Sequence, residues 1–96
     1  FLKTQTNQAA LVAEALARQT AYAQAGADGF FIPGLGDESL IADICQASTL
    51  PVNVMMLGSL TSLPTAARLG TARASFGPGP YRVAQEDLKA RAAKLF

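Results

Sequence analysis

A few polar and glycine residues stand within or just after short apolar runs, where a side chain or a backbone amide can meet a ligand. Asn53 interrupts the apolar run PVNVMM. A polar amide in an apolar strand costs roughly 1–3 kcal/mol unless it is hydrogen-bonded, so Asn53 needs a partner. The partner of Asn53 is either a ligand or neighbouring backbone, and in the second case Asn53 has only a structural role. The sequence leaves both possibilities open.

Ser75 lies near the end of a second apolar run, ARASF. Side chains alternate across a strand, so Ser75 shares one face with Arg73, while the apolar neighbours lie on the other. If that face points inward, the Ser75 hydroxyl is placed to contact a ligand. Arg73 would then lie deeper on the same face, or it would be exposed to solvent.

The segment SFGPGPY follows directly and contains two Gly-Pro pairs. Gly77 and Gly79 let a backbone approach closely and keep N–H groups that can donate, whereas the two prolines cannot donate. Before a helix, such a segment suits a phosphate or a carboxylate. The alternative is that the segment is only a rigid turn.

Several kinds of chemistry are missing from the chain. It contains no His and a single cysteine, Cys45, so Ser–His and Cys–His mechanisms within these residues are excluded. Cys45 fits a small buried apolar side chain. The acidic residues fall at helix starts, on helix faces or at a strand entry, and they form no visible pair for acid–base chemistry or metal binding. We therefore predict no catalytic residue and no metal ligand in this chain.

The charge and hydropathy patterns exclude other classes of partner. The formal net charge is +1 and the eight basic residues are scattered, so we expect no nucleic-acid partner. A membrane span needs about 20 consecutive apolar residues, and no such run exists. The start of the chain, FLKTQTNQ, lacks the pattern of a secretory signal. We expect a cytoplasmic protein.

The apolar pattern predicts the elements that must position these residues. Helical spacing covers residues 8–25, 38–48, 62–69 and 81–96, and apolar runs at 30–32, 50–56 and 72–76 read as strands. Continuous rather than alternating hydrophobicity indicates strands buried on both faces. The alternation favours an α/β fold with a parallel sheet of about three strands and four helices. Three strands are too few to close a barrel, so we expect part of a larger fold or association between chains.

Three segments in the correct order resemble one known family. AYAQAGADGFFIPGL, LPVNVMM and LGTARASFGPGPYR are together similar to the C-terminal part of the isocitrate lyase and phosphoenolpyruvate mutase superfamily. At the end of the strand after GAD, lyase-like members carry a glutamate, whereas this chain has Pro33-Gly34. Late in the next strand they carry an asparagine, whereas this chain has Met55, with Asn53 two residues earlier. In these two segments, the Pro-Gly and Pro-x-Asn forms resemble the phosphonomutase-like members more closely.

The resemblance implies a fold and an activity. It implies that residues 1–96 are the C-terminal segment of a (β/α)8 TIM barrel, a single unit whose N-terminal half is missing. The activity implied is that of a Mg²⁺-dependent carbon–carbon lyase or phosphonomutase-like enzyme acting on small 2-oxo or 2-hydroxy carboxylic acids. The magnesium ligands would lie outside this segment, and the last helix would pack on a neighbouring subunit of a homo-oligomer. The pocket wall would include Asn53, Gly34, Ser75 and Gly77.

Two other hypotheses remain at this stage. A non-catalytic half-barrel that serves as a binding or assembly module agrees with the lack of catalytic side chains. A segment of another phosphate-binding barrel would bind phosphate near residues 77–79 without needing magnesium.

Overall fold

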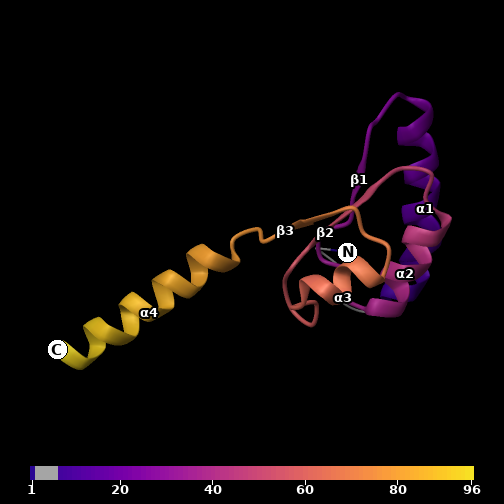
Figure 1. The fold of residues 1–96 in the computed structure, drawn as a ribbon. Helices are drawn as coiled ribbons and strands as arrows, with labels where there is room; N and C mark the ends of the chain where they lie inside the picture. Colours follow the sequence, from indigo (N-terminus) through magenta and orange to yellow (C-terminus); the bar gives the residue numbers. More distant parts are fainter. Residues whose placement is uncertain (2–6) are drawn as a thin grey trace.

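The computed structural model describes residue 1 and residues 7–96, and these alternate between helices and parallel strands (Figure 1). The order of elements is the one the sequence predicts. The segment FLKTQTNQ, which carried the expectation about a secretory signal, lies largely outside the described residues. The elements are α1 (Gln8–Gln24), β1 (Phe30–Phe31), α2 (Glu38–Ala47), β2 (Val52–Met55), α3 (Leu63–Arg68), β3 (Arg73–Ser75) and α4 (Gly79–Leu95).

The three strands form one parallel sheet in the order β1-β2-β3. In the register, Phe31 lies opposite Asn53, and Asn53 lies opposite Arg73. These three residues therefore form one row across the sheet. The side chains of this row share one face of the sheet.

Helices α1, α2 and α3 cover one face of the sheet. Val52 and Val54 point into this layer and are 2% and 0% exposed, and the helices contribute small and branched side chains that interlock with them. The buried cluster is Ala15, Phe30, Ile32, Leu35, Ile41, Ile44, Val52, Val54, Met56, Leu60 and Ala66.

The opposite face of the sheet carries Phe31, Asn53, Met55, Arg73 and Ser75, and we call it the open face. Phe31 is 46% exposed, so the expectation that the strands are buried on both faces is wrong for these residues. The pattern of apolar residues reflects both faces of a strand. In the described residues, helices cover only one of them.

Two helices begin at a residue whose side chain caps the first turn. The Asp37 carboxylate accepts a hydrogen bond from the Leu40 amide, and the Ser62 hydroxyl accepts one from the Thr65 amide. Each satisfies an amide that has no partner within its helix. The strand-to-helix loops are thereby fixed at the edge of the sheet where the strands end.

Helix α4 leaves the body of the molecule (Figure 1). It begins at Gly79, two residues before the predicted start at Tyr81. Pro80 fits in its first turn, because amides there have no helical partner and the ring fixes a helical φ. The helix has no buried residue. It raises the radius of gyration to 16.1 Å, against about 12.5 Å for a compact chain of this length.

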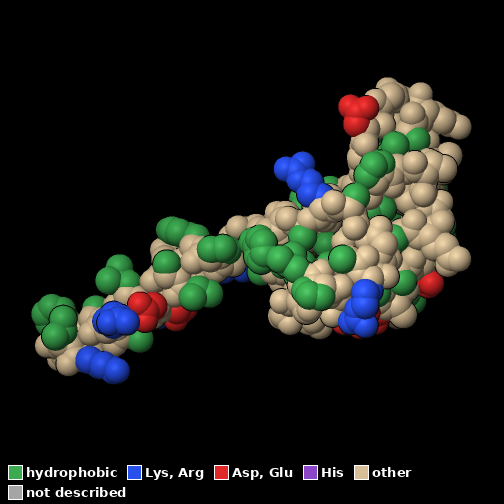
Figure 2. Space-filling model, viewed as in Figure 1, with side chains coloured by type: hydrophobic (Ala, Val, Ile, Leu, Met, Phe, Trp, Pro, Cys, Tyr) green, Lys and Arg blue, Asp and Glu red, His purple; other side chains and the backbone are tan. Residues whose placement is uncertain are grey.

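The surface of α4 carries both hydrophobic and charged side chains. Figure 2 shows hydrophobic side chains along this helix among charged ones. Tyr81, Val83, Leu88 and Leu95 are between 65% and 80% exposed. Among the described helices, none combines the length and the apolar character needed to cross a bilayer. A cytoplasmic location stays a prediction.

Candidate functional site

The C-terminal ends of the three strands meet at one edge of the sheet, which we call the C-terminal edge. A cavity of about 400 Å³ opens there between the loops that follow β1 and β2. In parallel α/β folds, ligands bind at this edge. The cavity is lined by Gln8, Gly34, Leu35, Gly36, Asp37, Met55, Leu57, Gly58 and Ser59.

Two side chains hold the first loop in place. Gln8 Nε2 donates a hydrogen bond of 3.2 Å to the carbonyl of Gly34, and Ser59 Oγ donates one of 3.0 Å to the carbonyl of Gly36. A Cβ atom on Gly36 would lie 2.8 Å from Ser59 Oγ. Gly34 has a φ of +92°, which favours glycine. The loop after β1 is therefore glycine-rich because its backbone bends sharply against the second loop.

Asp37 gives the cavity its acidic group. Its carboxylate accepts from the amide of Leu40 and from the hydroxyl of Ser39. The Leu40 hydrogen bond, and then the Ser39 hydroxyl, hold the pKa of Asp37 below its ordinary value. Asp37 is thus an ionised helix cap at neutral pH, which makes it a poor proton donor.

Met55 connects this cavity to the end of β3. It lines the cavity, and its Sδ lies 2.5 Å from the position that a Cβ on Gly77 would take. Gly77 has a φ of +53°, and its amide donates to Ser75 Oγ at 3.2 Å. The absence of a side chain at Gly77 therefore leaves the space that Met55 occupies.

The Gly-Pro segment is a turn whose amides are already in use. The Gly77 amide donates to Ser75 Oγ, and the Gly79 amide donates to the carbonyl of Phe76 at 3.1 Å. The expectation that both amides are available to an anion is therefore wrong. The rigid-turn interpretation fits this geometry, and the hypothesis of a phosphate site built on these two amides loses its basis.

Asn53 lies on the open face, two residues before Met55 along β2. Its Oδ1 atom is buried and has no hydrogen-bond partner among the described residues. Asn53 lines a second cavity of about 370 Å³, together with Phe31 and Arg73. Arg73, which the sequence left either inward or exposed, is exposed on this face of the described structure.

The four predicted ligand-binding residues are thus divided between the open face, which carries Asn53 and Ser75, and the loops at the C-terminal edge, which carry Gly34 and Gly77. Gly34 lines the cavity at the C-terminal edge, Ser75 and Gly77 adjoin it through Met55, and Asn53 lies one row deeper. Their role in binding stays a prediction. Sequence reasoning missed Gln8 and Ser59, because no local pattern reveals a hydrogen bond to a loop 26 or 23 residues away.

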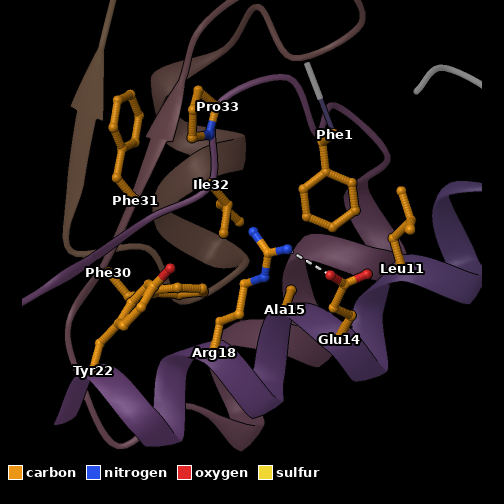
Figure 3. Close-up of a pocket in the computed structure, with 10 residues that line it drawn as sticks. All are labelled: Phe1, Leu11, Glu14, Ala15, Arg18, Tyr22, Phe30, Phe31, Ile32 and Pro33. Atoms are coloured by element: carbon orange, nitrogen blue, oxygen red, sulfur yellow. Dashed lines mark hydrogen bonds and ion pairs between the residues drawn. The ribbon is translucent and has the colours of Figure 1, made fainter. Parts of the chain in front are cut away.

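A larger cavity of about 440 Å³ lies on the helical side of the sheet, between α1 and β1. Figure 3 shows Arg18 and Glu14, paired at 2.6 Å, at its mouth, with Phe1, Leu11 and Ile32 along its walls. These side chains are mostly apolar and the ion pair is exposed. The cavity extends to Ile32 and Pro33 at the end of β1, but its mostly apolar lining gives no basis for ligand chemistry.

Neither a metal nor a nucleophile is supported by the donors in this region. Among residues 1 and 7–96, no three His, Cys, Asp or Glu side chains come together in a group that could hold a metal ion. Asp37 alone does not make the set of oxygen ligands that Mg²⁺ requires. Burial raises the pKa of the Cys45 thiol, which keeps it protonated and unreactive.

The family model described as phosphoenolpyruvate phosphomutase matches residues 1–96. The chain therefore belongs to the phosphoenolpyruvate phosphomutase family, which agrees with the resemblance in the sequence. Its fold is close to two crystal structures from Burkholderia cenocepacia J2315. One, an inferred phosphonomutase, shares 44% identity at a TM-score of 0.83, over 97% of this chain and 37% of that one.

The second structure, an inferred lyase/mutase, shares 37% identity at a TM-score of 0.82, over 88% of this chain and 31% of that one. Uncharacterized proteins of Mycobacterium tuberculosis, from strains CDC 1551 and H37Rv, are 38% identical over 64 residues, 67% of this chain. The chain spans 24% of the length of these curated relatives.

Proposed function

We propose that this chain is the C-terminal segment of a (β/α)8 barrel enzyme, a phosphonomutase-like mutase or carbon–carbon lyase for small 2-oxo or 2-hydroxy carboxylic acids. The observation that carries the proposal is the match of the family model to residues 1–96. The likeness to an inferred phosphonomutase at a TM-score of 0.83 supports it. No observation favours a non-catalytic half-barrel.

In this proposal, the chain supplies the wall of the substrate pocket. Gly34 and Met55 line the cavity at the C-terminal edge. Ser75 accepts a hydrogen bond from the Gly77 amide, so its own hydroxyl proton is free to be donated to a substrate oxygen. Met55 gives the wall an apolar surface that excludes water from the reacting groups. Asn53 completes the wall one row deeper.

We further propose that the enzyme uses Mg²⁺ and that the ligands of the metal lie outside residues 1–96. The residues that the structure describes do not form a magnesium site by themselves, because no three of their acidic, Cys or His side chains come together. When bound, such a metal would polarise the oxygens of an oxo acid. The residues of this chain would bind and orient the rest of the substrate.

Activity of the full-length protein tests this proposal. We expect turnover of a small 2-oxo acid or its phosphonate analogue, with loss on addition of EDTA and recovery with Mg²⁺. Ser75→Ala should lower kcat/KM about 3- to 10-fold, which corresponds to one neutral hydrogen bond of about 0.5–1.5 kcal/mol. Thr20→Val, at an exposed hydroxyl of α1, is the matched control. Normal kinetics in Ser75→Ala would remove Ser75 from the site.

We also propose that the protein is a homo-oligomer in which α4 packs on a neighbouring subunit. Leu88, Ala92 and Leu95 lie three or four residues apart and so share one side of the helix. Within the described residues, α4 has no buried side chain. A stable 17-residue helix usually needs an apolar surface that is packed, and a second subunit would provide that packing.

A further inference from the structure

We propose that Asn53 and Arg73 together form a carboxylate-binding site inside the completed barrel, one row deeper than the cavity at the C-terminal edge. This inference rests on the proposed barrel. Asn53 Oδ1 is buried without a partner. Within the described residues, Arg73 makes no ion pair or side-chain hydrogen bond. The two residues are direct neighbours in the register of β2 and β3.

The geometry brings the two groups to one cavity. Asn53 and Arg73 share the open face, and both line the cavity of about 370 Å³ together with Phe31. This cavity lies two residues before Met55 and Ser75, which is about 7 Å along the strands. It is therefore separate from the cavity lined by Gly34 and Met55.

The chemistry of the pair selects an anion. In a closed barrel the interior is filled by side chains, and a guanidinium there requires an ionised partner because the cost of an unpaired buried charge is large. Arg73 donates in a planar fork that fits a carboxylate at two points. Its remaining N–H groups are of the type that an amide oxygen such as Asn53 Oδ1 accepts from, and the Asn53 amide group can donate to the same carboxylate.

Among residues 1 and 7–96, no acidic side chain is paired with Arg73 at this cavity. Asp28 also lines it, but Asp28 is exposed and forms no ion pair with Arg73. Phe31, the third member of the row, is apolar. The carboxylate therefore comes from an acidic side chain elsewhere in the full-length protein or from a small carboxylic acid, and the two sources can be distinguished.

Thermal unfolding of the full-length protein without substrate is the first measurement. If the carboxylate is a side chain, Arg73→Met should lower the Tm by roughly 6 °C or more at neutral pH. A paired carboxylate has a lowered pKa in the folded state, so its contribution is present at neutral pH and is lost as the pH falls through that pKa. The difference in Tm between Arg73→Met and the wild type should therefore become smaller towards pH 4. Arg73→Lys should have a Tm between those of Arg73→Met and the wild type.

If the carboxylate is a small molecule, the result differs. Arg73→Met should then unfold like the wild type without ligand, and the rise in Tm that pyruvate produces in the wild type should be lost. Arg68→Met, at an exposed arginine of α3 with one hydrogen bond to Thr65, is the control for loss of charge. Asp28→Asn should resemble the wild type. A loss equal to that of Arg73→Met would make Asp28 the partner of Arg73 and would overturn the proposal that the carboxylate comes from elsewhere.

Asn53→Asp provides a test that does not depend on activity. In a site that already holds a carboxylate, a second one should lower the Tm. In a site without an anion, the new carboxylate should pair with Arg73 and raise the Tm. The proposal is overturned if Asn53→Asp is stabilising and both Arg73 variants match the wild type with and without pyruvate. The proposed function fails separately, through a lack of turnover, whatever these unfolding experiments show.

Discussion

Replacement of Gly77 by alanine tests how the turn after β3 and the wall of the cavity depend on each other. The backbone of Gly77 has a φ of +53°, and a Cβ there would lie 2.5 Å from Met55 Sδ and 3.2 Å from Met55 Cγ. An alanine in the left-handed region costs about 1–2 kcal/mol. Crowding of a packed side chain adds about 1–3 kcal/mol, towards the low end here because a methionine is flexible.

We therefore expect Gly77→Ala to lower the free energy of unfolding of the full-length protein by about 2–4 kcal/mol, the sum of the two terms. Gly58→Ala is a matched control, because Gly58 also has a positive φ, +65°, but no atom lies within 4 Å of its Cβ position. It should cost only the backbone term. Denaturant unfolding of both variants gives the difference, at unchanged m-values.

The double variant Gly77→Ala/Met55→Ala separates the two terms. Removal of the Met55 side chain should relieve the crowding, so that alanine at position 77 costs no more than in Gly58→Ala when measured in that background. If Gly77→Ala and Gly58→Ala are equally destabilised, the contact between Gly77 and Met55 plays no part in stability, and our account of the turn would be refuted.

Two further predictions concern the cap of α2 and the surface of α4. Asp37→Asn keeps a helix cap but removes a carboxylate whose pKa is lowered by the Leu40 amide and then by Ser39. Since the ionised carboxylate stabilises the folded state, the Tm of the wild type should fall relative to that of the variant between neutral pH and about pH 3. A difference in Tm that stays constant with pH would contradict this. Leu88→Glu should raise the dissociation constant of the oligomer at least about tenfold in sedimentation experiments, since a buried leucine contributes about 1.5–3 kcal/mol. Ala90→Glu, on the opposite side of α4, should have little effect, and equal behaviour of the two variants would count against a packed α4.

The sequence predicts the layer between helices and sheet well. Val52 and Val54 stand in an apolar run and are buried as expected, and the caps at Asp37 and Ser62 lie where their residue types indicate. These features depend on residues within one turn or one strand. Local patterns are therefore sufficient to place them.

The open face and the loops are predicted less well, because their structure depends on long-range contacts. Phe31 is apolar in an apolar run, yet it is 46% exposed. The hydrogen bond from Gln8 to Gly34 spans 26 residues and has no local signal. The amides of Gly77 and Gly79 look available in the sequence, but the turn uses both.

The sequential strand order has a consequence for the way the sheet comes apart. The central strand, β2, is hydrogen-bonded on both sides. The Ile32 amide donates to the carbonyl of Asn53, and the Ala72 amide donates to the carbonyl of Val52. In the described residues, β1 and β3 each have only this one neighbour. In residues 1–96 taken by themselves, local opening thus begins at the outer strands and reaches β2 last. In the proposed barrel, further strands would flank β1 and β3 and protect their amides as well.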